Sequence, residues 1–131
     1  MRPIGRVESP LSTRAEAPKR EDEDAPPARL VIDERFVDGL DGLRVGDMAV
    51  VVTWLHLSNR ELLTVRPRGD PKNPFTGVFQ TRSPDRPNPI GLHTVEITSV
   101  DAGTVGVAHL EALDGTPVID LKPVRRPRRA G

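Results

Sequence analysis

The sequence predicts a mainly β protein, namely a single small, mostly antiparallel β-barrel with short helical turns. The chain has 131 residues, and Leu, Ile, Val and Phe make up about a quarter of them, which suits one domain with a modest core. Val, Ile and Thr, which favour strands, occur 29 times. Pro occurs 14 times and Gly 11 times, so turns and rigid loops are frequent and long helices are not expected.

The N-terminal part is expected to form two strands separated by a long loop. The first strand covers residues 3–7, and the segment Glu8-Ser9-Pro10 ends it because proline interrupts a strand. Residues 12–28 hold three prolines and a run of charged residues without any period, which predicts a mobile loop, either at the rim of a site or disordered. The second strand, over residues 29–33, is a short apolar run with β-branched side chains.

The middle of the chain contains a short helix and the strongest strand signal. Residues 34–43 place apolar side chains at three- and four-residue spacing, as in one or two turns of amphipathic helix. Residues 47–57 have a continuous apolar centre, which predicts a strand that is buried on both faces or lines a barrel. A shorter strand is expected over residues 62–66 and an extended segment over residues 77–80.

The C-terminal half is predicted to begin with a β-hairpin. Residues 92–100 and 104–110 alternate apolar with polar or small side chains, and the linking segment Asp101-Ala102-Gly103 places glycine where a positive φ is favoured. A last strand is expected over residues 117–121. The barrel domain is therefore assigned to residues 1–123, followed by a basic tail over residues 124–131 that contains Arg125, Arg126, Arg128 and Arg129.

Composition excludes several classes of function. Lys and Arg equal Asp and Glu at 19 each, so no global charge points to nucleic acid or to a membrane surface. The absence of cysteine excludes disulfides and thiolate chemistry, and three histidines without ligand-like spacing make a metal site unexpected. No apolar run approaches the length of about 20 residues that a membrane span needs, so a cytoplasmic protein is expected.

The segment TRSPDRPNPIG, residues 81–91, is the most informative part of the chain. Its three prolines fix φ and restrict the preceding residues, so the loop is stiff before anything binds. It holds two guanidinium groups, Arg82 and Arg86, together with the Asn88 amide, and a guanidinium fork matches a carboxylate or a phosphate. The alternative is that both arginines pair with Asp85 or another acid and that the prolines only shape a turn.

Three longer segments and two shorter ones carry a resemblance to a known family. The shorter ones, WLHL (residues 54–57) and VRPRGD (residues 65–70), resemble the family's intervening segments. The strings GVFQTRSPDRPNPIGL (residues 77–92), LDGTPVIDLKP (residues 113–123) and PIGRVESP (residues 3–10) occur in the same order as in the TsaA-like, or TrmO, family of tRNA methyltransferases. The chain resembles this family over nearly its whole length. The resemblance implies a compact β-barrel that binds S-adenosylmethionine, usually as a homodimer with the cofactor near the subunit interface, and that methylates N6 of threonylcarbamoyladenosine beside the anticodon of certain tRNAs.

The resemblance also implies which residues contact the cofactor. The matching positions are Arg82, Leu92, His56, Leu57, Leu113, Asp114 and Gly115. The family often has a PRQ-like string after the first strand, and the nearest match here is Pro18 followed by Lys19 and Arg20. Gln80 stands where the family commonly has a small residue, so its amide is expected to line the pocket on the substrate side.

Methyl transfer from a sulfonium requires positioning of donor and acceptor and exclusion of water, with no metal and no covalent nucleophile. Asp114 and His56 are the candidates for the base that receives the acceptor's N6 proton. The alternative for Asp114 is structural, because Asp-Gly is a common turn pair.

RNA binding is expected to be electrostatic. The candidate contacts to the substrate are Arg86, Asn88, Gln80, Arg68 and Lys72, with Arg66, Arg82 and the basic tail in support. The chain has one Trp, three Phe and no Tyr, so stacking of bases on aromatic side chains is not expected to be the main device.

Two alternatives remain open at the level of the sequence. One keeps the fold and the cofactor but assigns a small-molecule acceptor, since the net charge is zero and an RNA-contacting C-terminal domain found in longer family members is not matched. The other is a non-catalytic module that binds S-adenosylmethionine or tRNA.

Overall fold

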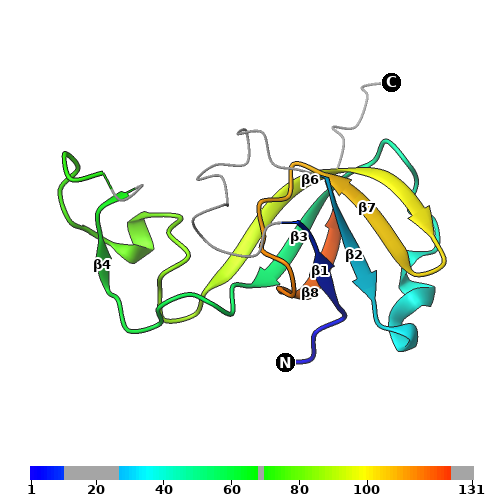
Figure 1. The fold of residues 1–131 in the computed structure, drawn as a ribbon, viewed down its shortest axis with the longest axis horizontal. Helices are drawn as coiled ribbons and strands as arrows, with labels where there is room; N and C mark the ends of the chain where they lie inside the picture. The colour runs from blue at the N-terminus through cyan, green and yellow to red at the C-terminus, as the bar shows by residue number, and fades with distance from the viewer. Residues whose placement is uncertain (11–26, 68–69, 125–131) are drawn as a thin grey trace, which may run out of the picture.

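Six strands close into an antiparallel barrel, as the sequence predicts (Figure 1). The computed structural model describes residues 1–10, 27–67 and 70–124. Around the barrel the strands follow the order β1-β2-β7-β6-β3-β8, and β8 pairs with β1 to complete the ring. Their bounds are β1 Gly5–Glu8, β2 Ala28–Ile32, β3 Met48–Trp54, β6 Ile90–Asp101, β7 Thr104–Ala108 and β8 Pro117–Pro123.

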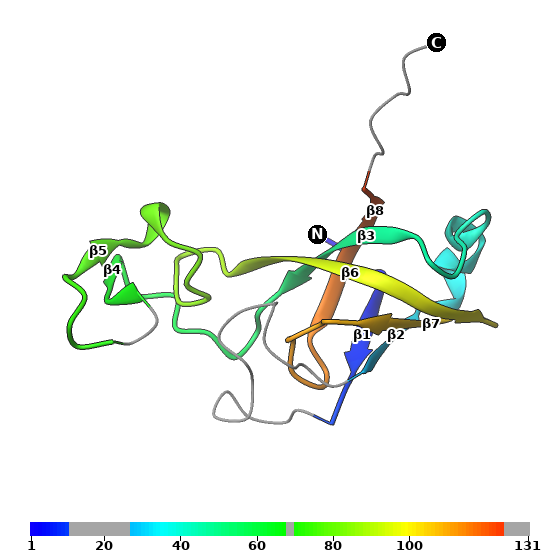
Figure 2. The same ribbon diagram turned by 90° about the horizontal axis from the view of Figure 1, so that it is seen from above.

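Two further short strands lie outside the barrel. β4 (Thr64–Val65) and β5 (Thr76–Gly77) form a separate two-stranded sheet. They belong to the segment between β3 and β6, residues 55–89, which we call the arm. Figures 1 and 2 both show the arm projecting away from the barrel, so the strands expected at residues 62–66 and near residue 77 do not take part in closing it.

One local expectation in the arm is wrong. Residues 78–80, expected to be extended, form the 3-10 helix η3 (Val78–Gln80). The Val78 carbonyl accepts from the Thr81 amide at 3.1 Å and from the Thr81 hydroxyl at 3.0 Å, and the Arg86 guanidinium also donates to it. Three donors converge on one carbonyl, so the backbone turns there instead of extending a strand.

The helical turn predicted over residues 34–43 is present and is shorter. It is the 3-10 helix η1 (Glu34–Leu40), and the Asp33 carboxylate caps it by accepting from the Arg35 amide at 3.0 Å. The apolar residues of the predicted face pack against the barrel core as expected. They are Phe36, Val37, Leu40 and Leu43.

The barrel interior is filled by alternate residues of the strands. The strand predicted over residues 47–57 is β3, whose alternating burial shows that it lines the barrel on one face only. On the predicted hairpin, one face of β6 and of β7 is buried as expected, and β6 extends to Asp101. The fully enclosed apolar core residues include Val7, Leu30, Val51, Val95, Ile97, Val105, Val107, Leu110 and Val118.

The turn of the hairpin has two residues rather than three. Ala102 and Gly103 have φ values of 46° and 85°, so both adopt left-handed conformations, as two-residue hairpin turns require. The positive φ predicted for the glycine is confirmed. Gly103 also lies against η1, where an added Cβ would come within 3.1 Å of a Val37 methyl group.

The strand order places the connections at two ends of the barrel. Since all neighbouring strands are antiparallel, successive connections alternate between the ends. The β1–β2 connection, the arm between β3 and β6, and the β7–β8 connection therefore leave from one end, which we call the arm end. The β2–β3 connection with η1 and the β6–β7 turn lie at the other, the hairpin end. No helix of the described residues is long and apolar enough to cross a membrane.

Candidate functional site

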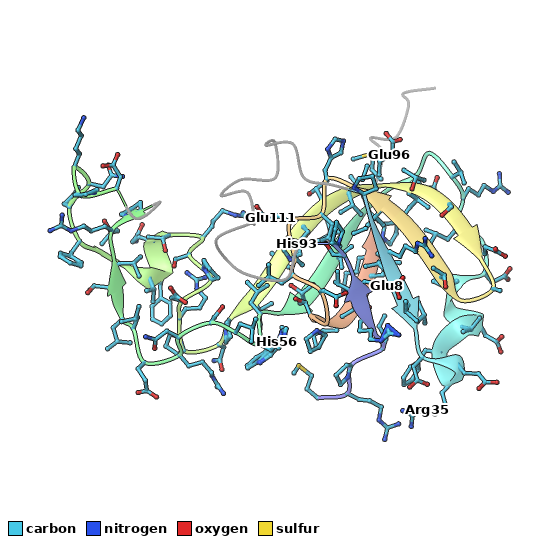
Figure 3. The ribbon with its side chains drawn as sticks, in the orientation of Figure 1. Glu8, Arg35, His56, His93, Glu96 and Glu111 are labelled. Atoms are coloured by element: carbon cyan, nitrogen blue, oxygen red, sulfur yellow. The ribbon has the colours of Figure 1, made fainter. Side chains whose placement is uncertain are left out.

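Every candidate site residue that the structure describes lies on the arm-end connections or at the first residues of β6. His56 and Leu57 begin the arm, while the residues from Gln80 to Asn88 end it. Leu113, Asp114 and Gly115 lie in the β7–β8 connection. In Figure 3, His56 lies on the side of the barrel that faces the arm, and Arg35 of η1 lies at the opposite side. Lys19, Arg20, Arg68 and the tail arginines fall outside the described residues.

The proline-rich loop at residues 81–91 is braced by its own polar side chains. The Thr81 hydroxyl accepts from the Ser83 amide at 3.2 Å, and the Ser83 hydroxyl accepts from the Asp85 amide at 3.2 Å. The Asp85 carboxylate accepts from the Asn59 amide at 2.8 Å, which ties the end of the arm to its beginning. These contacts act together with the prolines, so the loop is held in one shape within a single chain.

Four arginines of the arm donate to backbone carbonyls, and two of them, Arg86 and Arg60, bridge its loops. Arg86 donates to Val78 and, at 2.6 Å, to Thr81. Arg60 donates from Nε to the Pro87 carbonyl at 2.7 Å and from Nη2 to the Asn88 side chain at 3.3 Å. The five donors of a guanidinium fork suit this bridging of loops.

Arg60 was not found by sequence reasoning, although it is central to the arm. Its guanidinium carbon also lies 5.0 Å from the centroid of the Trp54 ring at the end of β3, so it joins the barrel to both sides of the arm. Its partners are 27 and 28 residues away in the sequence. No local pattern marks such a residue, because its role depends on how the arm folds back.

Arg82 and Leu92 lie together at the start of β6. The Arg82 side chain is exposed, and its Nη2 is 3.4 Å from the Leu92 carbonyl oxygen. Leu92 points outward and is 50% exposed. Its register partner Val52 and the pair Trp54 and Ile90 continue an apolar surface on the outside of β3 and β6. A cationic group thus borders an apolar wall, the combination that binds a ligand with one charged and one apolar part.

Beneath this wall the barrel contains a buried polar pair. The Thr53 hydroxyl and His93 Nε2 are 2.8 Å apart, and both side chains are buried. Burial, with a smaller contribution from the positive charge of Arg82, lowers the pKa of His93 to about 4, so the ring is neutral at physiological pH. His93 Nδ1 has no hydrogen-bond partner among the residues that the structure describes.

The pair explains the glycine at the end of the proline-rich loop. A Cβ on Gly91 would collide with the Thr53 hydroxyl and would lie 2.6 Å from His93 Nε2. Only glycine allows the backbone to approach the pair so closely. The sequence signal for this packing was the glycine itself, but its cause lies on another strand.

The β7–β8 connection makes a tight turn against β1. Gly115 has a φ of 82° and its amide donates to the Val7 carbonyl at 2.8 Å. The exposed Asp114 carboxylate accepts from the Ser9 amide at 3.0 Å, and Leu113 is buried. The structure therefore confirms that Asp114 and Gly115 form a turn. The role of Asp114 as a base stays a prediction.

The resemblance assigns Arg82, Leu92 and Asp114 to one cofactor, and within the described part of one chain Arg82 contacts Leu92 whereas Asp114 contacts Ser9. One cavity, of about 440 Å³, lies at the hairpin end beside η1 and the β6–β7 turn. A second, of about 270 Å³, is lined by residues that include Ser9, the partner of Asp114. Neither cavity is lined by the three residues. Among the described residues no cluster of three or more His, Asp or Glu side chains could hold a metal ion.

The fold and the arm-end loops define a class of protein, a small antiparallel barrel that presents a stiff, arginine-bearing TRSPDRPNPIG loop beside an apolar wall. The family model of the tRNA-methyltransferase O N-terminal domain matches residues 6–126. The chain belongs to this family.

Individual relatives agree with the family assignment. A probable S-adenosyl-L-methionine-binding protein of Methanothermobacter thermautotrophicus is 44% identical over 124 residues, which are 94% of this chain and 88% of that protein. An S-adenosyl-L-methionine-binding protein of Archaeoglobus fulgidus is 40% identical over 122 residues, covering 93% of this chain and 86% of that protein. A tRNA (adenine(37)-N6)-methyltransferase of Mus musculus is 52% identical over 48 residues, which are 37% of this chain and 11% of that protein.

A solved structure shows the same fold. The crystal structure of TrmO from Pseudomonas aeruginosa matches with a TM-score of 0.73 at 28% identity, over 94% of this chain and 54% of that one. The chain thus spans about half the length of the solved protein and most of the length of the archaeal relatives.

Proposed function

We propose that this chain is an S-adenosylmethionine-dependent methyltransferase that acts on N6 of an adenosine in tRNA. The observation that carries the proposal is the TRSPDRPNPIG loop, held rigidly at the arm end beside the exposed Arg82 and Leu92, in a chain of the TrmO N-terminal family. More specifically, we propose that the methyl acceptor is N6 of threonylcarbamoyladenosine beside the anticodon.

The residues at the arm end fit S-adenosylmethionine chemically. Leu57, 54% exposed, and Leu92 offer apolar surface for an adenine ring or a methionine chain. Arg82 has an exposed guanidinium that suits the carboxylate of the cofactor, and the exposed Asp114 carboxylate suits its amino group or ribose hydroxyls. Backbone groups of Leu113 and Gly115 complete the proposed cofactor-binding residues of the arm end. Lys19 and Arg20 are also assigned to S-adenosylmethionine.

When bound, S-adenosylmethionine supplies an electrophilic methyl group on a sulfonium. The chain's own task is to hold the acceptor nitrogen in line with that group and to exclude water. Asp114 and His56, both exposed at the arm end, are the candidates to take the N6 proton. Arg86 and Asn88 keep the loop in shape through Val78, Thr81 and Arg60, and Arg82 of the same loop reaches the Leu92 carbonyl on β6.

A homodimer completes the site in this proposal. Arg82 contacts Leu92 whereas Asp114 contacts Ser9, and a second copy against the outer face of β3 and β6 offers a way to bring the two sets to one ligand. Toward the arm end that face is apolar and partly exposed, which favours association over solvation, whereas Thr94 and Glu96 of β6 lie on it opposite Val50 and Met48. Its side chains include Met48, Val50, Val52, Trp54, Ile90 and Leu92.

The tRNA is assigned to the arm. Gln80 and Lys72 are exposed there, and Arg68 belongs to the same segment of the sequence. The basic tail after residue 124 and the cytoplasmic location remain predictions of the same proposal.

The test is mass spectrometry of nucleosides from tRNA incubated with the full chain and isotope-labelled S-adenosylmethionine. A labelled methyl group on N6 of threonylcarbamoyladenosine is the expected result. Label on N6 of another adenosine overturns the finer assignment alone. The absence of label from total tRNA, with binding of S-adenosylmethionine intact by calorimetry, overturns the activity and favours a small-molecule acceptor or a binding module.

Asp114→Asn and His56→Gln separate the two candidate bases. The variant that removes the base is expected to lower kcat by about 10²–10⁴-fold with little change in cofactor affinity. Asp114→Asn keeps an oxygen that accepts from the Ser9 amide, so the turn is retained. Normal turnover of both variants contradicts the assignment of a base to either residue.

A further inference from the structure

Two of the chain's three phenylalanines are exposed on the arm. Phe79 is 82% exposed and Phe75 is 66% exposed, whereas Phe36 packs against the barrel core. Exposed aromatic surface costs about 25 cal/mol for each Å² left in water. Two exposed rings on one projecting segment therefore indicate a surface that a ligand or partner covers during function.

The backbone around Phe79 holds its ring outward. Val78, its neighbour in η3, is fully buried, and the Val78 amide donates to the Leu63 carbonyl at 2.9 Å. Arg86 clamps the carbonyls of Val78 and Thr81 on either side of Phe79. With the backbone pinned before and after it, the exposure of Phe79 follows from the fold of the arm and not from a loose loop.

Phe75 already has a cationic partner on its ring. The Arg66 guanidinium carbon lies 4.5 Å from the Phe75 centroid, and Arg66 Nη1 donates to the Pro71 carbonyl at 2.7 Å, which fixes its position. A guanidinium stacked on a phenyl ring is an arrangement that accepts a nucleobase as a further layer, because every base has a π-face.

The charge of the arm favours a polyanion as the occupant. Residues 55–89 contain six Lys or Arg and three Asp or Glu, a formal charge of +3, in a chain whose total charge is zero. Two copies meeting through their arms would bring these like charges together, while RNA phosphates are attracted to them. The arm therefore suits single-stranded RNA better than it suits the arm of a second copy.

The position of Phe79 links this surface to the proposed site. Arg82 follows Phe79 by three residues, so their Cα atoms are at most about 10 Å apart. We propose that Phe79, assisted by the Phe75–Arg66 stack, is a platform for an unpaired RNA base next to the adenosine that is methylated. This inference rests on the proposed function and names the part of the tRNA that the arm recognises, a single-stranded loop rather than a duplex.

The experiment measures binding of a synthetic anticodon stem-loop RNA to the full chain by fluorescence anisotropy. Phe79→Leu keeps an apolar side chain but removes the ring, and it is expected to raise the Kd about tenfold, since one base stack is worth about 1–3 kcal/mol. Phe79→Trp is expected to restore or exceed wild-type affinity. The dependence of Kd on salt is expected to stay unchanged, because no phosphate contact is lost.

Two controls distinguish the platform from other effects. Val45→Ala alters a similarly exposed apolar side chain at the hairpin end and is expected to leave the Kd unchanged. Calorimetry with S-adenosylmethionine and light scattering are expected to give the same cofactor affinity and particle mass for Phe79→Leu as for the wild type.

The outcomes separate a failure of the Phe79 platform from a failure of the proposed methyltransferase function. If the wild type methylates tRNA and Phe79→Leu binds the stem-loop within about twofold of it, only the platform is wrong. If Phe79→Leu lowers the particle mass, the ring packs against a second copy and the platform is also wrong. If the wild type neither binds the stem-loop nor methylates tRNA, the proposed function fails together with the inference.

Discussion

The barrel and the arm are built by different interactions. The barrel encloses a cluster of thirteen buried apolar residues, eleven from its six strands and two, Leu110 and Ala112, from the β7–β8 connection, with η1 packed over it. The arm has one fully buried large apolar side chain among its described residues, Val78, and exposes Leu57, Leu63, Phe75 and Phe79. Its shape comes from prolines and from the guanidinium groups of Arg60, Arg66 and Arg86.

This difference separates stability from function. Burial of apolar area stabilises the barrel without reference to any ligand. The arm instead uses directional hydrogen bonds to hold a defined shape while leaving charged and aromatic side chains in water. A segment of this kind keeps its surface available for ligands, and the residues assigned to cofactor and tRNA lie mainly on it.

The largest expected effect comes from the barrel core. Ile97→Ala removes a fully buried side chain on β6 and is expected to lower the free energy of unfolding by about 2–5 kcal/mol, through lost burial and a cavity. Leu63→Ala, the matched deletion in the arm, is expected to change it by about 0.5 kcal/mol or less. Urea denaturation measures both, and equal losses at the two positions contradict the comparison.

The next effect depends on pH and tests the polar pair inside the barrel. The pKa of His93 is about 4 in the folded chain against an ordinary value of 6.5, so the unfolded chain binds a proton that the folded chain does not. The contribution of the neutral His93 ring to the free energy of unfolding is therefore complete above about pH 6.5. It falls by about 3 kcal/mol as the pH is lowered toward 4. Denaturation of the wild type and of His93→Gln at about pH 7.5 and pH 4 measures the difference.

His93→Gln is expected to show a shallower decline across that range, whatever its stability at neutral pH. The exposed His56, replaced by Gln, serves as the control and is expected to leave the decline unchanged. Identical pH profiles for the wild type and His93→Gln contradict the buried neutral state of the ring.

A smaller and more local effect is expected in the arm. Arg86→Lys keeps the positive charge but loses the fork that bridges Val78 and Thr81, at a cost of about 1–2 kcal/mol confined to the arm. Hydrogen exchange of the amides of residues 78–88 is expected to accelerate about tenfold, with exchange in β6 and β7 unchanged. Exchange that accelerates equally in barrel and arm contradicts a separately held arm.

The smallest effect belongs to the barrel surface. Glu8 and Arg29 form an ion pair of 3.9 Å between β1 and β2, and both side chains are at least half exposed. Glu8→Gln is expected to change the free energy of unfolding by no more than about 0.5 kcal/mol, because solvent screens such pairs. A double-mutant cycle with Arg29→Gln measures the coupling, and a value above about 1 kcal/mol contradicts the assignment of barrel stability to its apolar core.

The same contrast explains what could be predicted from the sequence. The strands of the barrel follow from apolar alternation, as with Val95 and Ile97, and the hairpin follows from a glycine that needs a positive φ. The family resemblance indicated the candidate cofactor residues, and strand order alone brings the connections that carry them to one end of the barrel.

The arm could not be predicted in the same way. Residues 62–66 and 77–80 have strand-like composition, yet only the two-residue strands β4 and β5 form there. The 3-10 helix η3 takes the place of the expected extended segment. The cause is a set of side-chain contacts such as Arg60 to Pro87, which no local period reports. Thr53 and His93, which lie 40 residues apart in the sequence, likewise pair across two strands, and no local pattern reports that pair or the packing of Gly91 against it.

We place the ligand site at the arm end of the barrel. Titration of the isotope-labelled full chain with S-adenosylmethionine, followed through backbone amide chemical shifts, locates the site. We expect the shifted amides to gather in the arm, the first residues of β6, and the β1–β2 and β7–β8 connections, with η1 and the β6–β7 turn unchanged. Shifts concentrated at the hairpin end, around the cavity beside Val37 and Gly103, would contradict it.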